Sequence, residues 1–149
     1  MSDQIKEQGK NDEYDCLLGL SGGLDSSYML HLAVHEYGLR PLVFHTDSGW
    51  NTDIAVNNIN SLVEKLNLDL YTDVVNWEQM KDFQLAFFKS GLPHIDIPQD
   101  MAFTAALYKY ALKFKIKTIL KREKKEKLVL ILRDEGESYR EIREQTGLG

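Results

Sequence analysis

The sequence is poor in the residues that mark secreted, disulfide-bonded or membrane-spanning proteins. Its single cysteine, Cys16, excludes a disulfide framework and a Cys-x-x-Cys metal site. No apolar run approaches the roughly 20 residues needed to cross a bilayer, and the N-terminus is polar rather than signal-like. These absences predict a cytoplasmic protein with no membrane partner.

Positive charge is also in short supply. Lys and Arg number 18 against 23 Asp and Glu, which gives a formal net charge of −5. This balance argues against broad electrostatic binding to nucleic acid. With 43% hydrophobic and 28% charged residues, a chain of 149 residues is expected to fold as one globular domain with its own core.

What the sequence does have is a glycine loop rich in hydroxyl groups near its start. The loop reads Ser21-Gly22-Gly23-Leu24-Asp25-Ser26-Ser27. An apolar strand is expected before it, at residues 16–20, and a buried helix after it, from residue 28. The helix N-terminus favours an anion through its N–H groups and its dipole, and adjacent glycines allow a ligand to approach the backbone. Because a carboxylate repels phosphate unless a cation separates them, Asp25 points to a polyphosphate bound with its metal ion. The alternative is a simple Gly-Gly turn with a serine N-cap.

Strands and helices alternate along the rest of the chain. Further strands are expected at residues 40–47, 68–75 and 118–120, and helices at about 53–66, 77–90 and 100–115. Crossovers of a dozen or more residues require parallel strands with right-handed connections. We therefore predict an α/β fold over residues 14–120: a doubly wound parallel sheet, Rossmann-like and three-layered, with ligands at the carboxyl ends of its strands. Residues 1–13 are polar and expected to be flexible.

Composition changes sharply at Lys121, which begins a segment expected to form a C-terminal helical tail, residues 121–149. The Lys/Glu run at 121–127 is typical of a solvated face, and an amphipathic helix is expected to continue through residues 128–132. Residues 132–148 resemble the first two helices of a helix-turn-helix module, without the helix that enters the major groove. We expect either this tail or a second subunit, in a homodimer, to cover the edge of the fourth strand.

The glycine loop is not a Walker A motif, because no Lys-Ser/Thr pair follows it. It resembles the pyrophosphate loop (PP-loop) of the N-type ATP pyrophosphatases, adenylating enzymes that cleave ATP between its α and β phosphates. Within this superfamily, residues 14–120 look most like the N-acetyl sugar amidotransferases of surface-polysaccharide (lipopolysaccharide) biosynthesis. The stretches that carry this second resemblance are Phe44-His-Thr-Asp-Ser-Gly-Trp-Asn51, Ile97-Pro-Gln-Asp-Met-Ala102 and Leu107-Tyr-Lys109. Met101 stands where this family has histidine, and family members continue beyond the fourth strand, so the sequence resembles a truncated member.

The resemblance implies ATP and Mg²⁺ as cofactors. The residues that would surround the phosphates are Leu20, Ser21, Gly22, Gly23, Leu24, Asp25, Ser26 and Ser27. Asp25 and Ser26 are the catalytic candidates, and Asp25 would hold Mg²⁺. Pyrophosphate leaves as an amide oxygen of the acceptor attacks the α phosphorus, and ammonia then displaces AMP. A separate glutaminase subunit would supply that ammonia.

Other candidate residues have two interpretations each. His45 and Asp47 follow the second strand, where they would either border the adenosine or form a strand-end histidine and an Asx turn. Trp50, Asn51 and Asp100 are candidate substrate residues, and Asp100 is equally suited to be a helix N-cap.

Two features on helices are less specific. Lys109 could reach a phosphate, although lysines on helices are usually solvated. His31 and His35 have a spacing that suits zinc, but without a third ligand the sequence does not predict a metal site there.

Three functions remain open at this point. The first is an ATP-binding, AMP-forming amidotransferase-type domain that acts on an N-acetylated sugar, inactive if it is truncated. The second is a tRNA-modifying PP-loop pyrophosphatase, although the negative charge and the lack of paired cysteines argue against the thiolating kind. The third is a nucleotide-binding remnant whose helical tail serves in protein interaction or DNA binding.

Overall fold

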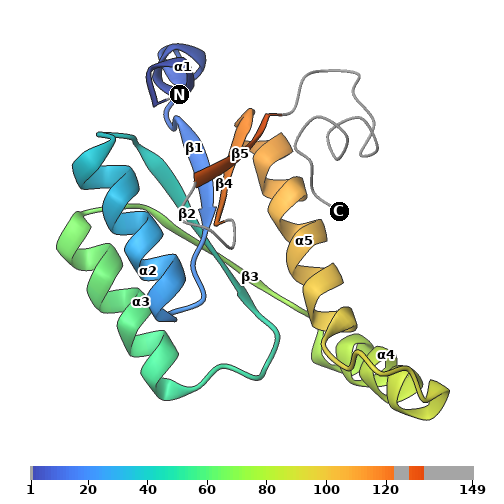
Figure 1. Cartoon of the computed structure of the whole chain (residues 1–149). Helices are drawn as coiled ribbons and strands as arrows, with labels where there is room; N and C mark the ends of the chain where they lie inside the picture. Colours follow the sequence, from blue (N-terminus) through green and yellow to red (C-terminus); the bar gives the residue numbers. More distant parts are fainter. Residues whose placement is uncertain (1, 123–127, 133–149) are drawn as a thin grey trace.

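A single twisted sheet organises the molecule, which we describe from a computed structural model at residues 2–122 and 128–132 (Figure 1). In spatial order its strands are β3 (Leu70–Val74), β2 (Pro41–Asp47), β1 (Cys16–Gly19), β4 (Thr118–Arg122) and β5 (Leu128–Leu132). The first four strands are parallel, and β5 is antiparallel to β4. The strand order reverses beside β1, which is the position where open α/β sheets bind ligands.

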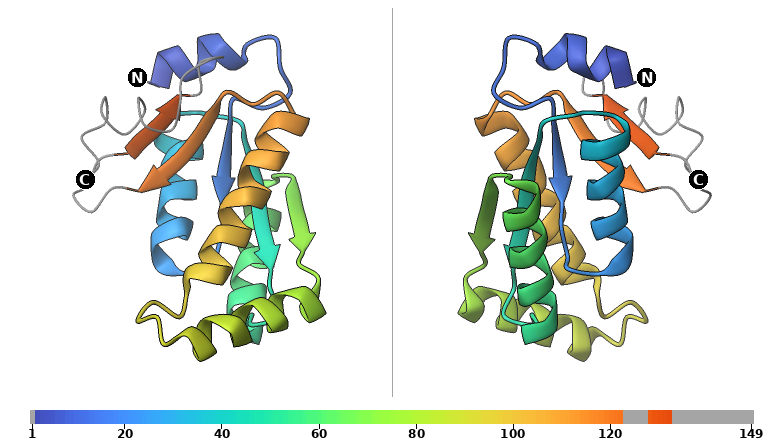
Figure 2. Two further views of the ribbon diagram at one scale, coloured as in Figure 1. Left: turned by 90° about the vertical axis from the view of Figure 1, so that its right-hand side faces the viewer. Right: turned by 90° about the vertical axis from the view of Figure 1, so that its left-hand side faces the viewer.

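Helices cover both faces of the sheet, as Figure 2 shows. On one face lie α2 (Leu24–His31), its π-helical continuation Leu32–Glu36, and α3 (Asp53–Leu66). On the other lies α5 (Ile97–Lys113). Successive residues of β1 serve the two cores in turn: Leu17 packs with α5, and Leu18 packs with α2 and α3. The predicted doubly wound, three-layered α/β fold is confirmed. No helix in the described residues is long and apolar enough to span a bilayer.

The ends of the helices follow from local capping. The Thr52 hydroxyl accepts from the N–H of Ala55 (3.2 Å) at the start of α3. Helix α4 (Trp77–Ser90) ends at Gly91, whose φ of +70° lies in the left-handed region. Helix α5 starts three residues earlier than predicted, because Pro98 fits the first turn, where its missing N–H costs nothing. Asp100 is therefore inside the helix, and its predicted role as N-cap is wrong.

A packed helix lies within the N-terminal segment for which the sequence predicts flexibility (residues 1–13). Residues Ser2–Gly9 form helix α1, and Ile5 in it is only 1% exposed within the core between the sheet and α2. The Arg40 guanidinium donates to the carbonyl of Gly9 (2.8 Å) and pairs with the buried carboxylate of Asp15 (2.6 Å). One apolar residue and one distant arginine thus fix a segment that is otherwise polar.

Truncating Ile5 tests whether α1 belongs to the folded core. We expect Ile5→Ala to lower the free energy of unfolding by about 2 kcal/mol, because it removes buried methyl groups and leaves a cavity. Urea denaturation followed by circular dichroism would measure the change. Gln4→Ala is the matched control, since Gln4 is an exposed neighbour on the same helix. Equal midpoints for the two variants would mean that α1 adds nothing to stability.

The C-terminal segment covers the edge of β4, but it does so as a strand. Strand β5 pairs antiparallel with β4, with Ile119 opposite Ile131, so the helix predicted through residues 128–132 is wrong. An unbroken run of Leu, Val and Ile fits a strand as well as a helix, and the open edge of β4 offers hydrogen bonds that only a strand can use. Of the charged run predicted at 121–127, residues 121 and 122 belong to β4, and the rest lies outside the described residues, as does all but the first residue of the helix-turn-helix likeness at 132–148.

Candidate functional site

The glycine loop follows β1 and leads directly into α2, at the carboxyl edge of the sheet. Gly23 is the N-cap of α2, and the first intrahelical bond runs from the N–H of Ser27 to the carbonyl of Gly23 (3.2 Å). The hydroxyls of Ser26 and Ser27 also donate to that carbonyl, at 3.2 and 2.8 Å. The Ser21 hydroxyl lies 3.1 Å from that of Ser26. The N–H of Gly23 donates to the Ser21 hydroxyl (3.5 Å), and the N–H of Leu24 precedes the first helical bond and therefore has no helical acceptor.

The two glycines of the loop have different roles. Gly22 has a φ of +77°, and a Cβ placed there would lie 2.8 Å from the Cα of Ala55 in α3. The Asn58 side chain, also from α3, donates to the carbonyl of Gly22 (3.1 Å). At Gly23 a Cβ would meet only the hydroxyl of Ser21, at 3.5 Å. Gly22 thus lets the loop rest on α3, while Gly23 leaves open space above the backbone.

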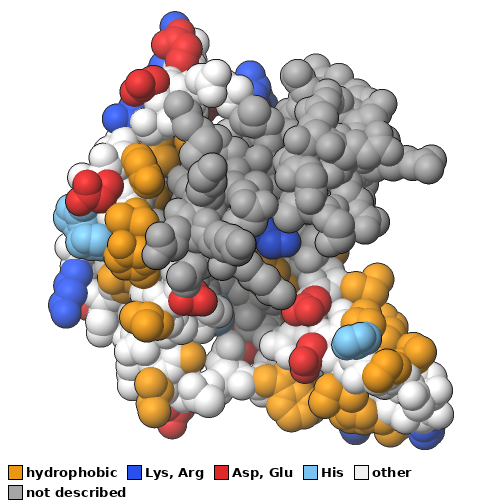
Figure 3. Space-filling model, in the orientation of Figure 1, with side chains coloured by type: hydrophobic (Ala, Val, Ile, Leu, Met, Phe, Trp, Pro, Cys, Tyr) orange, Lys and Arg blue, Asp and Glu red, His pale blue; other side chains and the backbone are white. Residues whose placement is uncertain are grey.

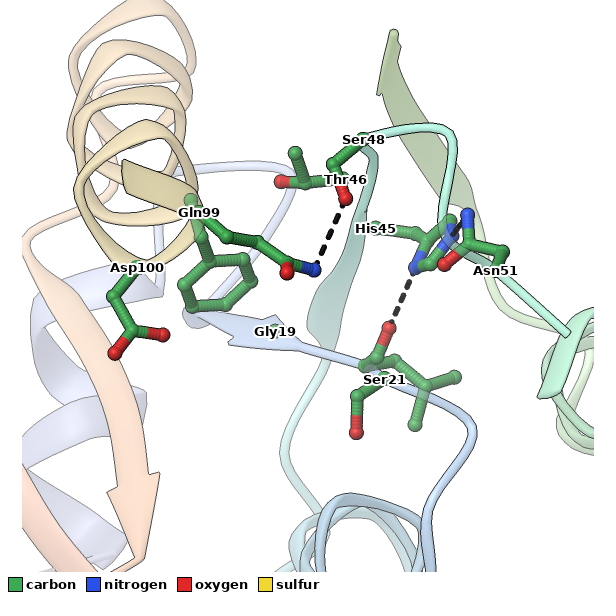
Figure 4. Close-up of a pocket in the computed structure, with 10 residues that line it drawn as sticks. Gly19, Ser21, His45, Thr46, Ser48, Asn51, Gln99 and Asp100 are labelled. Carbon is green, nitrogen blue, oxygen red and sulfur yellow. Dashed lines mark hydrogen bonds between the residues drawn. The ribbon is translucent and has the colours of Figure 1, made fainter. Parts of the chain in front are cut away.

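A pocket of about 380 Å³ adjoins the loop, between the carboxyl ends of β1 and β2 and the start of α5 (Figure 4). Its lining consists of Gly19, Leu20, Ser21, His45, Thr46, Ser48, Asn51, Gln99, Asp100 and Phe103. A Cβ at Gly19 would lie 2.5 Å from the ring of Phe103, so this glycine lets α5 approach the strand. The remaining walls are mostly neutral and polar.

His45 is the centre of a hydrogen-bonded chain along one side of this pocket. It is 8% exposed, and its Nδ1 lies 2.9 Å from the carbonyl of Leu20. Since a carbonyl only accepts, Nδ1 carries the proton, and Nε2 accepts from the side-chain amide of Asn51 (3.1 Å). The same amide donates to Asp47 Oδ1 (2.9 Å), which also accepts from the N–H of Gly49. Both nitrogens of His45 are therefore engaged within the protein, and Asp47 forms an Asx turn that orients Asn51.

The other predicted substrate residues occupy different places. Asp100 lines the pocket from α5. Trp50 does not line it: the indole is 57% exposed and meets Trp77 edge to face, with ring centroids 5.2 Å apart.

Sequence reasoning missed five residues of the lining: Gly19, Thr46, Ser48, Gln99 and Phe103. The Gln99 amide donates to the hydroxyl of buried Ser48 (3.0 Å), which ties α5 to the end of β2. The Thr46 hydroxyl is buried and has no hydrogen-bond partner among the described residues. Gln99 and Ser48 both lie within the stretches that carried the family resemblance, which was the available signal.

Lys109 lies away from the pocket and is engaged with a carboxylate. Its Nζ is 3.4 Å from Asp73 Oδ1 in β3, and the hydroxyl of Tyr110 donates to the same oxygen at 2.8 Å. The hydrogen bond to Asp73 raises the pKa of Tyr110, and burial raises it further.

Replacing Asp73 should make this effect measurable. We expect Asp73→Asn to lower the pKa of Tyr110 towards its ordinary value, because the anionic acceptor is gone. Since the pKa of Tyr110 is raised in the folded state, its contribution to stability is complete below the ordinary tyrosine pKa of about 10 and is lost as pH rises further. Titration of the Tyr110 ring carbon by NMR, assigned with Tyr110→Phe, would follow the pKa directly. An unchanged pKa of Tyr110 in Asp73→Asn would show that the hydrogen bond to Asp73 does not cause the shift.

Mg²⁺ suits the chemistry of the loop better than a transition metal. Among residues 2–122 and 128–132, no three His, Cys, Asp or Glu side chains form a metal-binding group, although the rings of His31 and His35 lie 4.6 Å apart. Mg²⁺ is held by one or two carboxylates together with phosphate oxygens and water, which fits the single carboxylate of Asp25 in the first turn of α2. Cys16 is fully buried in β1, and burial raises the pKa of its thiol to about 12, so it is neither a ligand nor a nucleophile in the folded chain.

Comparisons with known proteins place the fold. No protein-family model matches the sequence, and no curated protein is significantly similar to it. An NMN synthetase from Francisella tularensis is similar in structure, with a TM-score of 0.56, 24% identity, and coverage of 79% of this chain and 51% of that one. An NH3-dependent NAD synthetase from Campylobacter jejuni has a TM-score of 0.55, 20% identity and the same coverage. A glutamine-dependent NAD+ synthetase from Acinetobacter baumannii, in complex with ADP, has a TM-score of 0.60 and 17% identity over 79% of this chain and 23% of that one.

The chain therefore spans about half the length of the first two of these structures, and less of the third. These structures share the three-layered α/β fold of this chain. At these levels of identity the likeness concerns the fold.

Proposed function

We propose that this chain binds Mg·ATP and forms the nucleotide half of an AMP-forming, adenylating site. The observation that supports this most directly is the position of Ser21. Its hydroxyl belongs to the hydrogen-bonded loop at the N-terminus of α2, and the residue also lines the pocket at the ends of β1 and β2. A phosphate-binding helix terminus and a polar pocket large enough for part of a ligand are thus joined at one residue.

The chemistry assigned to the loop is electrostatic. The N–H groups of Gly23 and Leu24, with the hydroxyls of Ser26 and Ser27, stabilise the negative charge that develops on departing pyrophosphate. Mg²⁺, when bound at Asp25, neutralises phosphate charge. In the structure the single proton of each of these two hydroxyls points to the carbonyl of Gly23, so each hydroxyl must rotate away from that carbonyl to donate to a phosphate oxygen.

The acceptor that we propose is an N-acetylated sugar whose amide oxygen is adenylated. The pocket supports a neutral acceptor, because Thr46, Ser48 and Gln99 offer uncharged hydrogen-bonding groups and its lining includes no Lys or Arg. The carboxylate of Asp100 would repel an anionic acceptor. Ammonia would come from a separate glutaminase subunit, since the only cysteine is buried.

The fold likeness raises a second acceptor class. The similar structures are named as synthetases of NAD and NMN, so a pyridine nucleotide is the alternative substrate. Such a ligand is anionic, and the lining described above has no cationic side chain to receive it.

Two measurements on the full chain test these proposals separately. Isothermal titration calorimetry should detect ATP binding that requires Mg²⁺, and its absence would refute the nucleotide site. Pyrophosphate release from ATP should then be assayed with ammonium chloride and either an uncharged N-acetylhexosamine or nicotinate mononucleotide. If pyrophosphate is released with the pyridine nucleotide but not with the sugar, the proposed ATP site stands and the proposed sugar acceptor is wrong.

A further inference from the structure

Helix α4 has the smallest share of buried or half-buried residues among the described helices. Met80 is its one buried residue among those described, at 3% exposure, and Gln84 and Phe87 are half-buried. Figure 1 shows α4 at the far end of the molecule, below the carboxyl edge of the sheet. A helix of 14 residues is marginal in water on its own and normally takes its stability from a packed apolar face. This helix has few such contacts within the chain.

Large apolar side chains are exposed on α4 and on the segment that follows it. Figure 3 shows them gathered over this end of the molecule. They are Trp77 (43% exposed), Phe83 (41%), Leu85 (43%), Phe88 (56%), Leu92 (50%) and Ile95 (50%). Phe83 lies on the other side of the helix from Trp77, Leu85 and Phe88, and the remaining five side chains, at roughly 80–100 Å² apiece, present about 450 Å² per chain. With the exposed stems of Lys81 and Lys89 added, two such surfaces in contact would bury about 1,000 Å², the lower bound for a specific protein interface.

The outer side of α4 carries charge in a self-complementary order. Trp77, Lys81, Leu85 and Phe88 recur at intervals of three or four residues, which places them along one side of the helix. Glu78 and Lys89 are exposed on this same side, near opposite ends and three helical turns apart.

We propose that α4 is a dimerisation helix, which packs antiparallel against α4 of a second copy of this chain. In this arrangement Glu78 lies against the partner's Lys89, and two-fold symmetry forms the pair twice. A parallel arrangement would place Glu78 beside Glu78 and Lys89 beside Lys89, with the helix dipoles also aligned. The antiparallel pair is therefore the one that the charges select. This inference does not depend on the binding of ATP.

The proposal relocates the homodimer that the sequence suggested. The sequence predicted that either the C-terminal tail or a second subunit covers the edge of β4, and β5 occupies that edge. Dimerisation through α4 would instead adjoin the candidate site. Trp77 contacts Trp50, and the Trp77 ring also packs against Gly49, where a Cβ would come within 2.9 Å of it. The loop that carries Trp50 continues into Asn51 of the pocket lining.

Sedimentation equilibrium of the full chain tests the interface. We expect the wild type to be a dimer at micromolar concentration and Phe88→Glu to be a monomer. Phe88 is more than half exposed, so the variant should keep its far-UV circular dichroism spectrum and melting temperature as a monomer. Leu112→Glu is the matched control, because Leu112 is 59% exposed on α5, and it should remain dimeric. A monomeric wild type, or a dimeric Phe88→Glu, would overturn the proposal.

Charge reversal tests the antiparallel orientation. Glu78→Lys and Lys89→Glu should each weaken the dimer, by roughly threefold to tenfold at low salt, because each creates two like-charge contacts. An equimolar mixture of the two variants should recover the wild-type dissociation constant, since the heterodimer has only opposite charges in contact. A mixture no tighter than either variant alone would rule out the antiparallel pairing.

Discussion

Gly23→Val should reduce the affinity for Mg·ATP by at least about tenfold while leaving the fold intact. Gly23 has φ and ψ of −80° and 165°, an extended conformation that valine adopts readily. Only the Ser21 hydroxyl lies within 4 Å of the position of a Cβ, at 3.5 Å, so a side chain can leave the backbone here without a clash at its first carbon. The valine methyl groups would instead fill the space in front of the N–H groups of Gly23 and Leu24, where the phosphates are proposed to bind.

Calorimetric titration with ATP and Mg²⁺, together with a thermal melt of each variant, would separate binding from folding. Gly23→Ala is the control of smaller volume and should bind more tightly than Gly23→Val. Similar affinities for wild type and Gly23→Val would mean that the nucleotide does not approach this loop.

Asp25→Ala tests whether Asp25 contributes to ATP binding by holding Mg²⁺. We expect a loss of roughly tenfold to a hundredfold in affinity for ATP when Mg²⁺ is present, by analogy with the loss of groups that support a metal. In EDTA the variant should bind ATP at least as well as the wild type, because a carboxylate that repels phosphate has been removed. A loss of equal size with and without Mg²⁺ would show that Asp25 acts on the fold or on ATP rather than on the metal.

The parts of the fold that the sequence predicted well are those decided by neighbouring residues. The glycine loop, the cap at Thr52 and the end of α4 at Gly91 each depend on a conformation or a hydrogen bond that spans a few positions. The alternation of strands and helices then limited the topology to a parallel sheet, and the topology brought the ends of β1 and β2 together.

The parts that were missed depend on single contacts between distant segments. Arg40 fixes the N-terminal segment through Gly9 and Asp15, and nothing near Ile5 in the sequence reveals that it will be buried. The strand at residues 128–132 was misassigned for a related reason, because a short apolar run takes the secondary structure that its neighbour in space supports.

The candidate site shows the same division. The phosphate-binding loop could be predicted from its own residues, whereas the side chains that hold the site in place could not. Asn58 reaches the carbonyl of Gly22 from 36 positions away, and Gln99 reaches Ser48 from 51. These supporting residues fix the geometry of the site, and only the packing of α3 and α5 on the sheet identifies them.

Gly22→Ala should destabilise the protein by about 3 kcal/mol, more than any other loop substitution considered. The left-handed conformation at φ +77° costs a residue with a Cβ about 1–2 kcal/mol. The added Cβ would also overlap the backbone of Ala55, lying 2.8 Å from its Cα, so α3 must shift away from the loop. Thermal unfolding should report a fall of roughly 10 °C for a chain of this size.

Substitutions at two other glycines separate the cost of backbone strain from the cost of overlap with Ala55. Gly91 has a φ of +70° but nothing within 4 Å of a Cβ, so Gly91→Ala should cost only the backbone strain, about 1 kcal/mol. Gly23→Ala meets neither obstacle and should change stability by less than about 0.5 kcal/mol. If Gly22→Ala were no more destabilising than Gly91→Ala, the contact between the loop and α3 would not be the one that holds the loop in place. We expect the loss of stability to be largest for Gly22→Ala, smaller for Gly91→Ala and smallest for Gly23→Ala. This order would mean that the contact with α3 holds the loop of the proposed phosphate site in place.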